Sequence, residues 1–133
     1  MKTIALGFLL YATSFHVLAE WTVIDDGFKN GISNYYIDAT TINRSDGLSN
    51  MWVLIDYIEP QSNTYDRTTS YRSLRAFVEY NCKNQSQRVL NRKLHSDYMG
   101  RGIVLKSVDS KGKWTALSNG TAGLLAWKMA CSK

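Results

Sequence analysis

The clearest periodic pattern in the chain is an alternation of apolar and polar positions over residues 73–82. Every second residue on one side is apolar, and Phe77 is the single apolar residue on the other side. Because successive side chains of a β-strand point to opposite faces, this run predicts a strand with one buried face. The alternation places Cys82 on the apolar side, pointing towards the core.

Other β-rich runs, separated by turn residues, predict further strands at residues 21–25, 35–42, 51–58, 87–94, 103–108 and 114–117. Residues 51–55 are apolar at every position, which predicts a central strand covered on both faces. The pair Asp46-Gly47 predicts a hairpin, and its spacing from the flanking runs suggests a loop of more than two residues. Residues 60–70 are polar and are expected to form the longest loop.

The chain ends in a helical pattern over residues 121–131, in which Leu124, Trp127 and Cys131 recur on one stripe. Ser118 or Asn119 is the expected N-cap. The short connections between strands favour antiparallel pairing, because parallel neighbours need long crossovers. We therefore predict an α+β domain in which an antiparallel sheet of about six strands carries one C-terminal α-helix packed on a face.

The first residues have the layout of a secretory signal peptide, with Lys2 before an apolar run and Val17-Leu18-Ala19 before a cleavage site. We expect a leader at residues 1–19 and a single mature domain at residues 20–133. No cysteine follows the cleavage site, so no lipid anchor is evident, and no second apolar run is long enough to span a membrane. The predicted location is the periplasm or the outside of the cell.

Cys82 and Cys131 are the two cysteines of the chain. In a secreted protein a disulfide is the default for such a pair, and both residues are predicted to point inward. The alternative is a reactive thiol at Cys82, activated by Lys83 and Arg88, but it lacks a resolving cysteine nearby. We expect the disulfide, which closes a loop of about 50 residues and would stabilise the fold by about 4 kcal/mol.

Charge is distributed unevenly along the chain. Residues 20–66 carry eight Asp and Glu against two Lys and Arg, whereas residues 67–113 carry eleven Lys and Arg against three Asp and Glu. This asymmetry is consistent with an acidic partner, or with acidic strands that pair with basic ones in the sheet. Solvated strand faces are the plainer interpretation of the basic strands. The candidate basic binding surface, for a protein or an anionic glycan, is Arg75, Arg88, Arg92 and Lys93.

Catalytic signals are weak in this sequence. His95 is the single histidine after the leader and stands in no recognisable catalytic context, and no Gly-x-Ser-x-Gly motif is present. One histidine and two paired cysteines do not make a metal site. No nucleic-acid motif is present either, and export separates the chain from cytoplasmic nucleic acid. We expect neither enzymatic activity nor a cofactor nor a metal.

An ordered series of aromatic, turn and cysteine positions resembles the bacterial surface-adhesin protein E family over essentially the whole mature region. The series comprises Trp21, Tyr36-Ile37-Asp38, Ile42, Met51-Trp52-Val53-Leu54, Asp56-Tyr57, Tyr71-Arg72-Ser73, Glu79-Tyr80-Asn81-Cys82, Arg88-Val89-Leu90, Gly102, Trp114 and Cys131. The resemblance implies an antiparallel sheet with a C-terminal helix tied by Cys82 and Cys131.

The resemblance also implies a non-enzymatic protein of the Gram-negative envelope. The namesake of the family is an adhesin that binds host extracellular-matrix proteins such as laminin and vitronectin and can associate as a dimer. No short motif allows its ligand-binding residues to be placed here. The alternative function is that of a soluble periplasmic accessory or structural protein that contacts another envelope component.

Overall fold

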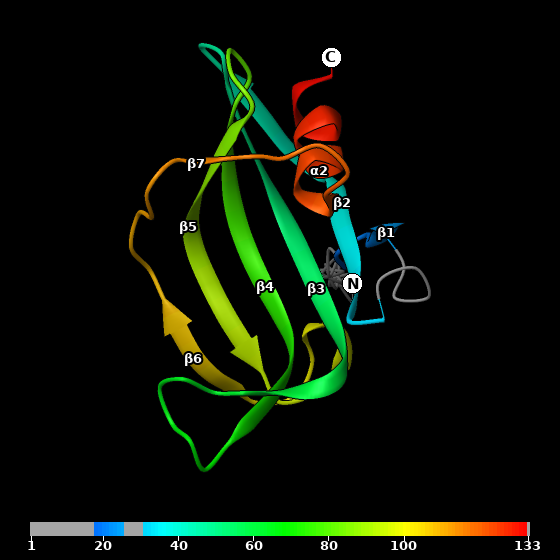
Figure 1. Ribbon diagram of the computed structural model, residues 1–133, viewed down its shortest axis with the longest axis vertical. Coiled ribbons are helices and arrows are strands. Elements are labelled where there is room, and N and C mark those ends of the chain that lie inside the picture. Colours follow the sequence, from blue (N-terminus) through cyan, green and yellow to red (C-terminus); the bar gives the residue numbers. More distant parts are fainter. Residues whose placement is uncertain (1–17, 26–30, 133) are drawn as a thin grey trace, which may run out of the picture.

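The computed structural model describes residues 18–25 and 31–132. Most of the predicted leader, residues 1–19, therefore lies outside the described residues. One antiparallel sheet and a short helix against one of its faces make up the described fold (Figure 1). The strands are β1 (Thr22–Asp25), β2 (Ser33–Ser45), β3 (Leu48–Ser62), β4 (Ser70–Asn81), β5 (Ser86–His95), β6 (Val104–Val108) and β7 (Thr115–Ala116), with the 3-10 helix η1 (Tyr98–Gly100) and the helix α2 (Ala122–Cys131).

The strands follow one another across the sheet in the order β1-β2-β3-β4-β5-β6, and each pairs antiparallel with its neighbour in sequence. β7 lies off this path and pairs with the first two residues of β5. The predicted α+β class, with an antiparallel sheet and one C-terminal helix, is confirmed. Among the described residues, no helix is long and apolar enough to cross a membrane.

The hairpin between β2 and β3 is tighter than the sequence suggested. Ser45 pairs with Leu48, so Asp46 and Gly47 alone form the turn, and both have positive φ values, of 53° and 76°. A two-residue turn with this geometry matches the twist of antiparallel strands and favours Asp-Gly. The expected longer loop was wrong because both strands extend beyond their apolar runs into polar residues.

The polar segment after β3 is also shorter as a loop than expected. β3 continues through Pro60 to Ser62, and Gln61 and Ser62 pair with β4 after a register shift. Pro60 falls within the shift, where a strand can accept a residue without a backbone N–H. Buried Asn63 then fixes the remaining loop by bonding the Tyr65 N–H and the Thr69 hydroxyl. The prediction of a loop from residue 60 was therefore wrong at its start.

The helix α2 packs on the sheet through small residues. Ala126 and Ala130 are fully buried, and the Ser49 hydroxyl donates to the Ala130 carbonyl oxygen at 2.7 Å. Alanines at the contact let the helix backbone approach the strands closely. The N-cap is Thr121, whose hydroxyl accepts from the Leu124 N–H, so the expected cap at Ser118 or Asn119 was wrong.

We call the side of the sheet that carries α2 the helix face. Its core consists of buried apolar side chains from β2, β3 and β4 together with the two helix alanines, and it comprises Ile37, Met51, Val53, Ala76, Val78, Tyr80, Ala126 and Ala130. The predicted inward side of residues 73–82 supplies three of these positions. The alternation of that strand is thus explained by packing under the helix.

The opposite side, which we call the outer face, is also covered, although its polar residues were expected to be solvated. Ser73 and Leu54 are fully buried there. The segment containing η1 lies over them, and the N–H groups of Met99 and Gly100 donate to Asp56 Oδ1 and Ser73 Oγ. Gly100 has a positive φ of 68°, which favours glycine, and a Cβ added there would lie 2.8 Å from Arg75 Cδ.

The predicted disulfide between Cys82 and Cys131 is present, with the two Cα atoms 5.5 Å apart. It joins the end of β4 to the end of α2. The indole Nε1 of Trp127 donates to the Asn81 carbonyl oxygen at 2.8 Å beside it. Covalent and hydrogen-bonded links therefore hold the helix at one end of the sheet, as Figure 1 shows.

Replacing both cysteines by alanine should lower the free energy of unfolding by about 4 kcal/mol, because the unfolded chain regains the entropy of an open loop of about 50 residues. Denaturant unfolding measures the loss. Thiol reductant should reproduce it in the native chain and leave the double-alanine variant unchanged. A native chain that is equally stable with and without reductant, or that titrates with two free thiols, would contradict this expectation.

Candidate functional site

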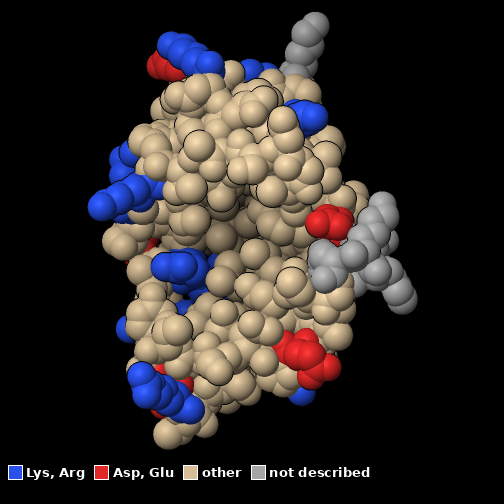
Figure 2. All heavy atoms as spheres, in the orientation of Figure 1, with Lys and Arg blue, Asp and Glu red and all other residues tan. Residues whose placement is uncertain are grey.

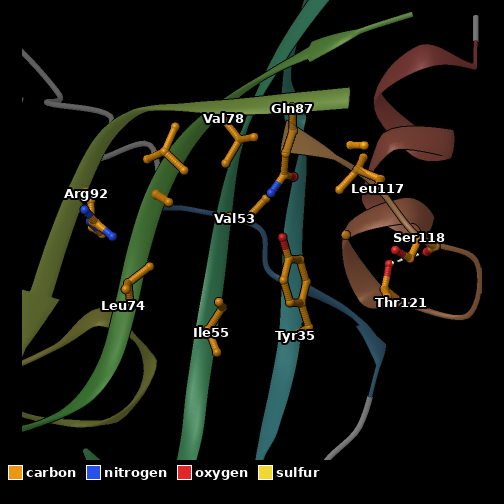
Figure 3. A pocket seen from close by; sticks show the side chains of 14 residues that line it. Tyr35, Val53, Ile55, Leu74, Val78, Gln87, Arg92, Leu117, Ser118 and Thr121 are labelled. Atoms are coloured by element: carbon orange, nitrogen blue, oxygen red, sulfur yellow. Dashed lines mark hydrogen bonds between the residues drawn. The ribbon is translucent and has the colours of Figure 1, made fainter. Parts of the chain in front are cut away.

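The helix face contains a hollow with a volume of about 420 Å³. Its floor is formed by apolar side chains of β3 and β4, including Val53, Ile55 and Val78. One edge is closed by the segment that follows β7 and by the first turn of α2 (Figure 3). Figure 2 shows the hollow in the middle of this face, with a basic side chain at its rim.

The hollow exists because α2 covers only part of the sheet. The helix lies over the end of the strands near Cys82, and β4 and β5 continue past it in Figure 1. The chain between β6 and α2 crosses the face. Besides the pairing of β7 with β5, Gly112 N–H donates to the Val89 carbonyl and Leu117 N–H donates to the Gln85 carbonyl, just before β5. That crossing segment forms a wall of the hollow without filling it.

Arg92 supplies the charge of the hollow. It is the only charged residue among the described residues that line it, and it is exposed. No carboxylate of residues 18–25 or 31–132 forms an ion pair with it. Figure 3 shows its guanidinium group directed over the apolar floor. An uncompensated cation above apolar surface favours an anionic group on whatever occupies the hollow.

Two polar side chains line the hollow opposite Arg92. The Gln87 Oε1 atom is buried and has no hydrogen-bond partner among the described residues, so it can accept a hydrogen bond from a bound group. Burial raises the pKa of Tyr35 to about 12. The phenol therefore stays neutral near pH 7 and leaves the positive charge of Arg92 unopposed.

The four residues of the predicted basic surface are not brought together. β5 contains one extra residue between Val89 and Asn91. Val89 pairs with Val78, and Asn91 pairs with Phe77, the neighbouring residue of β4. Arg92 consequently lies on the helix face with Ala76, whereas Lys93 lies on the outer face with Arg75. Strict alternation would have placed Arg88 and Arg92 on one face. Whether any of the four binds a ligand is still a prediction.

On the outer face the basic side chains are already engaged. The guanidinium of Arg88 forms an ion pair with Glu79 and lies 4.4 Å from the centre of the Trp114 ring. That of Arg75 lies 5.2 Å from the centre of the Trp52 ring. The ion pair joins β4 to β5 across the strands. Both of its residues belong to the basic part of the chain, so it does not test whether acidic strands pair with basic ones.

His95, the best catalytic candidate in the sequence, is a buried residue of the outer face. It is 4% exposed, and neither ring nitrogen has a hydrogen-bond partner among the described residues. Its cross-strand neighbour Ser73 donates its hydroxyl hydrogen to the Asp97 carbonyl oxygen at 2.6 Å. The serine hydroxyl is thus committed to the backbone, and this geometry does not activate it for attack.

Comparison with known proteins decides the family. A model of the family described as surface-adhesin protein E matches residues 21–132. The chain belongs to the surface-adhesin protein E family. Membership in this family points to a surface adhesin, a binding protein that contacts other molecules in the envelope or outside the cell. No curated protein matches the chain.

Solved structures of protein E from Haemophilus influenzae share the fold. The selenomethionine form of its protein E has a TM-score of 0.62 at 16% identity, with 87% of this chain and 88% of that chain covered. Protein E from the non-typeable organism has a TM-score of 0.60 at 17% identity, covering 91% and 81%. At this identity the likeness shows the fold of the adhesin E family and leaves the binding residues to be found.

The sequence reasoning missed most of the hollow. Gln87, Tyr35 and Ser118 come from β5, from β2 and from the segment before α2, and no spacing in the sequence joins them. The available signal was the excess of apolar inward positions on β3 and β4 over what one ten-residue helix can cover. Arg92 was named as a candidate, but as part of a basic surface with Arg75, Arg88 and Lys93.

Burial lowers the pKa of His95, and the positive charges of Arg75 and Lys93 lower it further. The unfolded chain therefore takes up a proton near the ordinary pKa of about 6.5, while the folded chain resists it until lower pH. Stability is fully present above about pH 6.5 and should be lost as pH falls below that value.

The variant His95→Leu should lose less stability than the native chain over this range, as chemical unfolding at a series of pH values will measure. Equal pH slopes for the two proteins would contradict the assignment.

Proposed function

We propose that this chain is a non-enzymatic, exported envelope protein that binds a protein partner through the hollow on the helix face, with host extracellular-matrix proteins as the first partners to test. Membership in the surface-adhesin family supports a binding role. We choose the hollow as the binding site because the charge of Arg92 lies above an apolar floor and is not compensated by an ion pair.

The chemistry of the hollow defines what the partner presents. An apolar side chain fits over Val53 and Val78, and a carboxylate beside it can accept charge-assisted hydrogen bonds from Arg92. A hydrogen-bond donor of the partner can satisfy Gln87 Oε1. Pockets that receive one anchoring side chain next to a shielded charge often supply most of the binding energy of an interface. We therefore expect a partner segment in which an apolar residue adjoins Asp or Glu.

An anionic glycan along β5 is less well supported by the same geometry. Its four basic residues divide between two faces, and Arg88 is neutralised by Glu79. Self-association as a dimer is implied by family resemblance alone. Sedimentation of the mature protein over a range of concentrations tests it directly.

The cellular location of the protein distinguishes the adhesin function from the alternative, that of a periplasmic accessory protein. We propose export across the inner membrane and display at the cell surface. Antibody labelling and protease treatment of intact cells should reach the protein. Detection only in the periplasmic fraction would contradict the adhesin function and favour a partner within the envelope.

Two variants test the site. Arg92→Gln removes the charge, and Ser118→Phe places a ring at the exposed rim of the hollow without altering the buried core. Each should weaken binding to immobilised laminin or vitronectin about tenfold or more, because a charge-assisted hydrogen bond or the anchoring contact is lost. Surface plasmon resonance measures the change.

Matched controls are Arg44→Gln and Ser110→Phe, which make the same changes at exposed positions outside the hollow. Both controls should bind as the native chain does. Binding that survives both site variants would contradict the hollow as the contact, whereas a native chain that binds neither matrix protein would contradict the proposed partners.

A further inference from the structure

A buried carboxylate on the outer face lies beside the backbone nitrogen of Glu20. Asp38, in β2, is 3% exposed. Its Oδ1 atom accepts from the backbone N–H and hydroxyl of Thr40, and its Oδ2 atom accepts from the Glu20 N–H at 3.2 Å. Within residues 18–25 and 31–132, no Lys or Arg forms an ion pair with Asp38. A carboxylate this deep is costly to bury without a cation.

The cation that lines the same hollow among the described residues contacts an aromatic ring and not Asp38. Arg75 lines the same hollow of about 220 Å³ as Asp38, but its guanidinium lies over the Trp52 ring. The remaining lining comes from neutral residues, among them Ala19 and Trp21. The hollow therefore contains a carboxylate that no cation of the described residues pairs with. Its Oδ2 atom faces the backbone N–H of Glu20.

Glu20 is also the residue expected to begin the mature chain. Hydrolysis of the Ala19–Glu20 peptide bond transfers the hydroxyl of a water molecule to the Ala19 carbonyl carbon and a proton to the Glu20 nitrogen. That nitrogen becomes an amine and takes a further proton from solvent, because α-amino groups have pKa values near 7.7–8.0. A neutral N–H donor at 3.2 Å from Asp38 Oδ2 is thereby replaced by a positive charge at the same place.

We propose that Asp38 is the binding site for the α-ammonium group of processed Glu20, so that removal of the leader completes a partly buried ion pair and fastens the N-terminal segment to the outer face. Trp21 is the next residue and lines the same hollow as Trp52. The ion pair holds Trp21 in that position. The precursor, which has only a neutral N–H at this point, is less stable than the mature protein, so full stability follows processing.

This inference depends on cleavage before Glu20 and not on the identity of any binding partner. The experiment compares four proteins, each exported with its own leader and isolated after processing. They are the native chain, a chain with Ser and Gly inserted after Ala19, the variant Asp38→Asn, and Asp38→Asn with the same insertion. The insertion keeps the cleavage site and moves the ammonium two residues away from position 38.

The insertion should lower the midpoint of thermal unfolding by several degrees in the chain with Asp38. In the Asp38→Asn background it should change the midpoint by no more than the scatter between replicate melts, since asparagine keeps the Thr40 contacts but has no charge to pair. Equal losses in both backgrounds, or no loss in either, would overturn the proposal. So would mass analysis showing that the processed chain begins at a residue other than Glu20.

A second measurement decides the matter if Asp38→Asn does not fold. The α-amine of native processed protein should react with an amine-directed reagent at least several times more slowly than that of the folded insertion chain, because the ion pair holds it protonated and shielded. Equal reaction rates for the two termini would show that Asp38 does not bind the ammonium.

Discussion

The length of α2 is the constraint on which the rest of this structure depends. Ten helical residues span about 15 Å, whereas the thirteen residues of β2 and the fifteen of β3 extend over more than about 40 Å. The disulfide and the contacts of Ala126 and Ala130 place this short helix at one end of the sheet. The other part of the helix face is therefore left as an apolar surface with no helix above it, and that uncovered part contains the hollow.

The apolar residues of the outer face are covered in a different way. Among the described residues no α-helix lies there, and the chain uses short segments instead: the 3-10 helix η1 with its flanking residues at one end, and Trp21, just before β1, at the other. Irregular backbone brings many N–H groups to the sheet, and polar side chains such as Asp56 and Ser73 accept them. This explains why the outer face has polar residues in the sequence and is nevertheless largely buried.

Period-two alternation and the cysteine pair were enough to predict the class of fold, the direction in which Cys82 points and its link to the helix. Those features depend on patterns within single segments. The register shift near Leu90 could not be predicted, because one extra residue in β5 reverses the face of every later side chain and leaves no mark in composition. Arg88 and Arg92 therefore lie on opposite faces, although simple alternation would place them on the same one. The hollow could not be predicted either, since its lining joins residues from six separate elements and depends on where the helix ends.

The disulfide also determines how the domain would carry mechanical tension. A force applied to the chain beyond Cys131 does not have to pass through the helix. It crosses directly to Cys82, at the end of β4, and β4 is hydrogen-bonded along its length to both β3 and β5. The load is then shared by two rows of strand hydrogen bonds, and α2 stays seated on the sheet while they hold.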